Sequence, residues 1–213
     1  MNRLQYLLLK VIEESGEIAD EVLISGLSAQ VHLEIDDLEA VLRLIESEFN
    51  THAFFSGRRV GQETNKTTLF NPEQDWSKEF LKACLALSKI ACKCMQFGLL
   101  ETQAERTERN IDRLGDSVSH LFNTINILNQ LYGFNYKTDE DRIANKIQKI
   151  QKYYDYSISL GLVINDPVPK DQYPEFKVFL DEYNIYGHYD VFVQKNESSL
   201  NNANVICLPI KNV

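Results

Sequence analysis

Apolar residues recur at helical spacing along most of the chain, and this periodicity constrains the fold more than any other feature. In the first helix, expected from about Leu4 to Leu23, they stand three or four positions apart on one face: Leu4, Leu7, Leu8, Val11, Ile12, Ile18, Ala19 and Val22. Ser25-Gly26 ends that helix. The same spacing predicts four more helices, at about 28 or 34 to 49, 76–97, 111–131 and 139–160. We therefore expect a mainly α protein.

Two segments depart from the helical pattern. β-prone runs on both sides of Gly57–Gly61 predict a small β-hairpin near residues 52–70. The proline-rich C-terminal residues predict a short irregular tail that ends in strands near 189–194 and 204–209. We accordingly divide the chain into three parts: an acidic helical segment with its hairpin (1–75), a helical domain (76–162) and a C-terminal extension (163–213).

Charge and composition narrow the possible partners. The net charge is −9, and residues 1–75 hold 6 Lys and Arg against 14 Asp and Glu. Such a surface repels phosphate backbones and attracts divalent cations, which argues against nucleic acid as a partner. No apolar run approaches the roughly 18 to 20 residues of a membrane span, so no membrane partner is expected. The 4 cysteines lack the spacing of a disulfide framework. They predict free thiols and a cytoplasmic location.

Paired carboxylates on two successive helices are the feature most suggestive of chemistry. Glu13-Glu14-Ser-Gly-Glu17 lies on the first helix, and Glu34-Ile-Asp-Asp37 lies on the second. Acids three or four positions apart are neighbours on a helix surface, and a turn near Gly26 would pack the two helices antiparallel. Clustered carboxylates repel each other unless a cation neutralises them, and hard oxygen ligands suit Mg²⁺. Spacing alone leaves an ordinary solvated helix face open as an explanation.

This EExxE and ExxD pattern, with the flanking residues Leu8–Glu14 and Glu34–Leu42, resembles the all-α, MazG-like nucleoside triphosphate pyrophosphohydrolases. The resemblance implies an antiparallel helical bundle that uses magnesium to hydrolyse a nucleoside triphosphate to a monophosphate and pyrophosphate. Carried over by position, it implies Mg²⁺ ligands at Glu14, Glu17, Glu34 and Asp37. Glu13 would be a further ligand or the catalytic base that orients the attacking water.

Residues 79–162 also resemble a phage-type member of this family, over a longer span. Ser88–Gly98 is similar to the end of the first motif helix, Asn110–Asp116 to the second, and Lys146–Leu162 to the trailing helix. Other residue types stand where the family's acids belong: Lys82, Ala83, Ala86 and Arg113. The resemblance thus implies a degenerate copy without a metal cluster. Lys82 and Arg113 would instead face the phosphate oxygens of the substrate.

Two interpretations of residues 1–75 follow. In a tandem duplication, the two copies form an intrachain pseudo-dimer, or the chain forms a homodimer, and the first copy binds Mg²⁺ and nucleoside triphosphate. In the alternative, residues 1–72 are a winged helix with a second helix at Ile18–Leu27, a third at Asp36–Phe49 and the hairpin as its wing. That chain would be a catalytically inactive binding or regulatory protein. Its acidic third helix would repel DNA, so its partner would be a protein.

The first interpretation carries an expectation about stability. If the acids of the first copy lie together without a counter-charge, Glu17→Gln or Asp37→Asn relieves their repulsion. Either change should then abolish turnover while leaving stability unchanged or raised.

Overall fold

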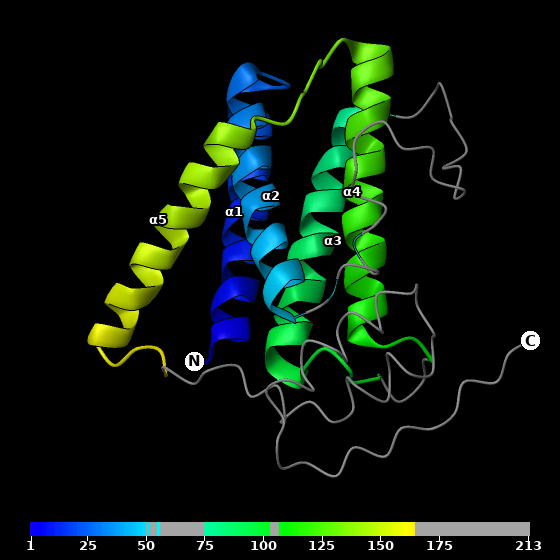
Figure 1. Cartoon of the computed structure of the whole chain (residues 1–213). Coiled ribbons are helices and arrows are strands. Elements are labelled where there is room, and N and C mark those ends of the chain that lie inside the picture. The colour runs from blue at the N-terminus through cyan, green and yellow to red at the C-terminus, as the bar shows by residue number, and fades with distance from the viewer. Residues whose placement is uncertain (50, 52–54, 56–74, 103–106, 165–213) are drawn as a thin grey trace, which may run out of the picture. The chain divides into compact units, whose positions relative to one another are not determined.

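The computed structural model describes residues 1–49, 51, 55, 75–102 and 107–164, which are mainly helical and contain no strand (Figure 1). These residues form five helices: α1 (Arg3–Ser25), α2 (Ala29–Phe49), α3 (Trp76–Phe97), α4 (Asn110–Tyr132) and α5 (Glu140–Ser159). All five belong to one compact unit, Met1–Pro169. The helices expected from the apolar periodicity are confirmed. The expected hairpin near 52–70 and the expected strands of the tail lie outside the described residues.

Local signals set the two ends of α1. The side chain of Asn2 accepts a hydrogen bond from the backbone N–H of Gln5 at 2.9 Å, and the side chain of Gln5 accepts one from the N–H of Asn2 at 3.0 Å. This reciprocal capping box satisfies backbone donors that a helix start leaves free. At the other end, Gly26 takes a φ of 66°, which residues with a Cβ rarely adopt. α1 therefore ends at Ser25, and the chain turns back at Gly26 before the acidic motif of α2 begins.

The first two helices form an antiparallel hairpin. Arg3, at the start of α1, donates to both carboxylate oxygens of Glu48 near the end of α2, at 2.7 and 2.8 Å. At the opposite end, the hydroxyl of Ser28 donates to Glu21 at 3.4 Å. This arrangement places the middle of α1 opposite the first half of α2, which is where the acids of the two motifs lie.

The hairpin differs from the helices that a winged helix requires. The expected second helix at Ile18–Leu27 lies mostly within α1, which continues unbroken to Ser25. The expected third helix at Asp36–Phe49 is the later part of α2, which already begins at Ala29. Two long helices thus replace the three short ones, because a single glycine such as Gly16 is tolerated inside a helix and the apolar spacing of α1 continues past it to Val22. The expected wing falls outside the described residues.

The core joins this hairpin to the rest of the unit. α1 packs against α2 and α3, α4 packs against α3, and α5 packs against α2 (Figure 1). The contacts between helices are made by large side chains that are almost completely buried, among them Leu7, Leu8, Ile35, Leu38, Trp76, Phe80 and Phe122. Each such side chain contributes about 1.5–3 kcal/mol through its removal from water. No described helix is long and apolar enough to cross a membrane.

The segment between α4 and α5 is held by side chains on both sides of it. Gly133 ends α4 with a φ of 62°. The side chain of Asn129 makes two hydrogen bonds with the backbone of Tyr136: it accepts from the N–H at 2.8 Å and donates to the carbonyl at 3.1 Å. From α2, the ring of His32 makes a 2.9 Å hydrogen bond with the carbonyl of Phe134. These contacts set α5 alongside α2, with its first half close to the acidic motifs.

Candidate functional site

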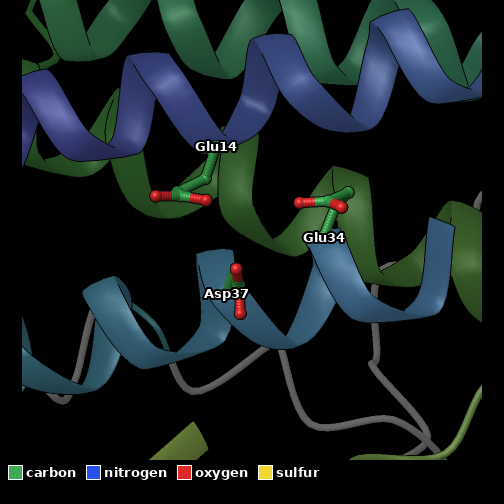
Figure 2. Close-up of side chains that lie close together, drawn as sticks. All are labelled: Glu14, Glu34 and Asp37. Carbon is green, nitrogen blue, oxygen red and sulfur yellow. The ribbon is translucent and has the colours of Figure 1, made fainter. Parts of the chain in front are cut away.

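Three of the predicted metal ligands lie together between α1 and α2. Glu14 of α1 and both Glu34 and Asp37 of α2 each offer a carboxylate oxygen within 4.8 Å of the others (Figure 2). The spacing of Glu34 and Asp37 places them one turn apart on the same face of α2, and the antiparallel hairpin brings Glu14 opposite them. We call these three residues the acidic cluster. Three carboxylates so close together need a compensating positive charge.

Glu14 is the most buried member of the acidic cluster. Its exposed fraction is 0%, so this glutamate lies on the buried face of α1, which apolar side chains otherwise occupy. Burial raises the pKa of its carboxyl to about 7, against the pull of Lys146 beside it, and the charges of Glu17 and Asp37 add to the rise. A carboxyl group in this state takes up or releases a proton near neutral pH.

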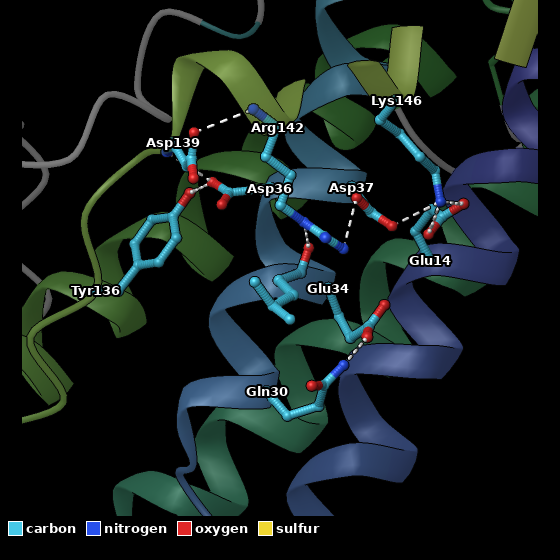
Figure 3. Close-up of polar contacts among 10 residues, drawn as sticks. Glu14, Gln30, Glu34, Asp36, Asp37, Tyr136, Asp139, Arg142 and Lys146 are labelled. Carbon is cyan, nitrogen blue, oxygen red and sulfur yellow. Dashed lines mark hydrogen bonds and ion pairs between the residues drawn. The ribbon is translucent and has the colours of Figure 1, made fainter. Parts of the chain in front are cut away.

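Asp37 is neutralised by two side chains of α5. Lys146 donates to one of its oxygens at 2.7 Å, and the guanidinium of Arg142 lies 3.0 Å from the other (Figure 3). Arg142 also donates to the carbonyl of Leu33 at 3.1 Å, which fixes the orientation of its guanidinium. Both contacts to Asp37 are charge-assisted. The contact with Lys146 is also largely buried and so is stronger than an ordinary surface ion pair, whereas Arg142 is half-buried.

Lys146 is the positive charge inside the acidic cluster. Its Nζ lies 3.0 Å from Oε1 and 3.1 Å from Oε2 of Glu14, and only the contact with Oε2 has hydrogen-bond geometry. Burial would lower the pKa of Lys146, but the hydrogen bonds and charges of Asp37 and Glu14 outweigh it and raise that pKa. Because Lys146 is held by Asp37 as well, it stays charged. Glu14 is therefore the member of the pair that takes up or releases a proton near neutral pH.

Glu34 lies at the edge of the acidic cluster. It is half-buried, and its carboxylate accepts a hydrogen bond from the side chain of Gln30, one turn earlier on α2, at 2.9 Å. That bond holds one oxygen of the carboxylate toward Gln30, on the side away from Asp37 (Figure 3). Glu34 thus keeps unoccupied acceptor capacity close to solvent.

Asp36, which the sequence motif places beside Asp37, belongs to a separate network. One of its oxygens accepts from the hydroxyl of Tyr136 at 2.8 Å and from the N–H of Asp139 at 3.2 Å (Figure 3). Burial raises the pKa of this carboxyl, and the two hydrogen bonds oppose that rise. Asp36 therefore anchors the segment that leads into α5 and points away from the acidic cluster.

The remaining acids of the first motif are exposed. Glu13 pairs with Lys10 at 2.6 Å. Glu17 lies outside the acidic cluster, yet it is close enough to raise the pKa of Glu14. Of the five acids predicted from the sequence, three lie together, Glu17 flanks them on the solvent side, and Glu13 turns toward Lys10.

The two residues predicted to contact phosphate lie on α3 and α4. Lys82 is exposed on α3, where it pairs with Glu79. Arg113 is half-buried on α4, and its Nη1 is buried without a hydrogen-bond partner. Its charge acts on the buried thiol of Cys94, which places Arg113 at the interface of α3 and α4. Neither contacts the acidic cluster among the described residues.

Sequence reasoning did not single out the basic residues of α5. Arg142 and Lys146 stand four positions apart, which places them on the same face of the helix. That spacing could have indicated a basic pair. The spacing could not indicate which lysine of α5 contacts the acids, because Lys149 and Lys152 continue the same run of positive charge.

The donor set of the acidic cluster fits a hard divalent cation. All three residues offer carboxylate oxygens, and Oε1 of Glu14 is buried without a hydrogen-bond donor. Carboxylate oxygens are the ligands that Mg²⁺ prefers, together with water and substrate phosphates. The competing feature is Lys146, whose ammonium already neutralises two of the three acids.

Comparison with known proteins adds no family to this geometry. No family model matches the chain, and neither a curated protein nor a solved structure is significantly similar to it.

Proposed function

We propose that this chain is a Mg²⁺-dependent nucleoside triphosphate pyrophosphohydrolase whose active site is the acidic cluster. The observation that carries the proposal is that the carboxylate of Glu14 on α1 lies beside those of Glu34 and Asp37 on α2. An ordinary solvated acidic face would leave these side chains apart in water. Here two of the three are buried, at a cost that a functional site would explain.

The charges of the site suit a triphosphate substrate that arrives with a divalent cation. Glu14, Glu34 and Asp37 would hold the ion, and the exposed Glu17 would add a carboxylate at its solvent side. When bound, Mg²⁺ supplies neutralisation of the triphosphate charge and activation of a water molecule. Arg142 and Lys146 add the positive charge that phosphate oxygens need. The role of Glu13 as the base that orients water remains a prediction, because its side chain is exposed and pairs with Lys10. The phosphate contacts predicted at Lys82 and Arg113, and the expected homodimer or pseudo-dimer, remain predictions.

A second candidate function is favoured by Lys146. Its contacts with both Glu14 and Asp37 would serve equally well as a permanent counter-charge in a protein that has lost catalysis. The chain would then be an inactive binding or regulatory protein on a pyrophosphohydrolase scaffold. The two candidates differ in one observable, which is pyrophosphate release.

The test is incubation of the full chain with a panel of nucleoside triphosphates and Mg²⁺, scored for pyrophosphate and monophosphate. We expect release from at least one nucleotide, with loss of turnover in Glu14→Gln and in Asp37→Asn. Asp20→Asn is the matched control, because Asp20 is an exposed acid of α1 outside the acidic cluster. Absence of release across the panel would favour the second candidate. Turnover that survives both substitutions would place catalysis elsewhere in the chain.

A further inference from the structure

Lys146 occupies the position that a cation bound by the acidic cluster would need. Its Nζ lies within 3.1 Å of both oxygens of Glu14 and 2.7 Å from one oxygen of Asp37. An ammonium group and a divalent ion cannot share these oxygens at such distances without strong repulsion between them. One of them must leave for the other to bind.

The side chain of Lys146 can leave without taking α5 with it. Its ammonium is carried on a flexible four-carbon stem. α5 has other attachments: Ile143, Ile150 and Tyr154 are buried, and the first turn is held by the ion pair of Arg43 with Glu140. At its later end, the side chain of Gln151 accepts from Arg3 at 3.0 Å. A change at Lys146 is therefore a local event on a helix that stays docked.

We propose that Lys146 is a tethered counter-ion that competes with a divalent cation for Glu14 and Asp37, so that cation binding releases the Lys146 side chain into solvent. The inference rests on the proposed function, because it assumes that the acidic cluster binds a cation. In the free protein, Lys146 offsets the repulsion among the buried acids. In the loaded protein, the divalent ion takes over that role, and Lys146 becomes available to the phosphates of the incoming substrate.

The first experiment measures cation affinity directly, with Mn²⁺ as a spectroscopic probe for a hard oxygen site. Binding of Mn²⁺ to the full chain is followed by electron paramagnetic resonance for the wild type, Lys146→Met and Lys149→Met. Removing the competitor should tighten binding in Lys146→Met by about tenfold or more. Lys149→Met is the matched control, since it removes the same charge from an exposed position on the same helix and should bind Mn²⁺ like the wild type.

The second experiment needs no variant and stands even if Lys146→Met fails to fold. The wild-type chain is treated with an amine-acetylating reagent with and without Mn²⁺, and the acetylated lysines are quantified by mass spectrometry. Mn²⁺ should increase the acetylation rate of Lys146 severalfold and leave that of Lys149 unchanged. A rate at Lys146 that does not change when the cation is bound would overturn the proposal.

The outcomes separate this proposal from the proposed function. Equal or weaker Mn²⁺ binding in Lys146→Met, in a wild type that hydrolyses nucleotide, would overturn the competition and leave the pyrophosphohydrolase in place. Binding in Lys146→Met alone would support the competition, while indicating that the wild type is held in its inactive state. No binding in either protein would overturn both proposals, because the acidic cluster would then not be a cation site.

Discussion

Acids that look equivalent in the sequence occupy different environments in the structure. Glu14 is fully buried with a partly protonated carboxyl, Asp37 is buried between two cations, and Glu34 lies half-buried at the edge. Glu17 is exposed beside them. Such differences assign different roles to residues of the same type, because burial and neighbouring charge decide which carboxyl is ionised.

Glu14 should make the stability of the protein depend on pH. Its pKa is about 7 in the folded state against 4.5 for an unperturbed carboxyl. As the pH rises through this window, the unfolded state releases the proton first, so folding loses stability, by roughly 3 kcal/mol in all. Urea unfolding with a chelator present, at pH 4.5 to 7.5, should show this decline in the wild type and a flatter profile in Glu14→Gln. Parallel profiles for the two proteins would contradict the burial of an ionisable Glu14.

Asp37→Asn should destabilise the protein, which reverses the expectation drawn from the sequence. That expectation assumed acids without a counter-charge, whereas Asp37 contacts Lys146 at 2.7 Å and Arg142 at 3.0 Å. Removing one partner of a buried ion pair leaves the other uncompensated, so we expect the free energy of unfolding at pH 7 to fall by about 3 kcal/mol. Glu17→Gln changes an exposed side chain and should stay within about 0.5 kcal/mol of the wild type. Equal effects of the two substitutions would argue against the ion pairs of Asp37.

At the scale of elements, α5 is the helix that completes the site. It brings Arg142 and Lys146 to acids that belong to α1 and α2, from more than a hundred residues away in the sequence. Its placement depends on the segment after Gly133, which is pinned by Asn129 and by the hydroxyl of Tyr136 on Asp36. The polar network around Asp36 therefore positions the basic side chains, although it contacts none of the acidic cluster among the described residues.

Tyr136→Phe should loosen that placement. The change removes the donor to a buried carboxylate oxygen, so the free energy of unfolding should fall by about 1–3 kcal/mol. Amide hydrogens in the first turns of α5 should exchange faster as a consequence. Tyr132→Phe, at an exposed position four residues earlier, removes the same hydroxyl and should change neither measurement. If both variants exchanged alike in α5, the contact with Asp36 would not be what holds the helix.

At the scale of the whole molecule, the interface of α1 and α3 joins the helices of the acidic cluster to α3 and α4. α3 and α4 form a second antiparallel hairpin, with the thiol of Cys94 against Asn110 at one end and the ring of Phe80 against Phe134 at the other. α1 packs against α2 and α3 at once, so the two hairpins share one core. A fragment of residues 79–162 would expose the face of α3 that α1 covers, and its inactivity would show loss of folding as readily as loss of the acids. The predicted inactivity of residues 79–162 is better tested in the full chain, where it requires that turnover be lost in the substitutions at Glu14 and Asp37.

The shared core predicts that the five helices unfold together. Trp76, the only tryptophan of the chain, is buried at the start of α3, so its fluorescence reports the second hairpin. Circular dichroism at the helix band reports all five helices. The two signals should follow the same urea transition, as two-state unfolding requires. Separate midpoints would show that the two hairpins are independent folding units.

The sequence by itself determined the helices and the order of the acids along them. Apolar spacing of three and four residues and the breaks at Gly26, Gly98 and Gly133 act within a few residues of each other, so they can be read from the chain directly. The spacing of Glu14, Glu34 and Asp37 also predicted that they would meet once the first two helices packed antiparallel.

Only the tertiary structure decided how the acids are neutralised and which of them are buried. The choice of Lys146 over Lys149 and Lys152 depends on the rotation and height of α5 against α2, which the linker at Tyr136 sets. The exposure of Glu17, three residues from the buried Glu14, likewise depends on which side of α1 its neighbours cover. Charge and burial act through space between elements distant in sequence. Local patterns therefore predicted that these acids would lie together but not that the ammonium of Lys146 would lie among them.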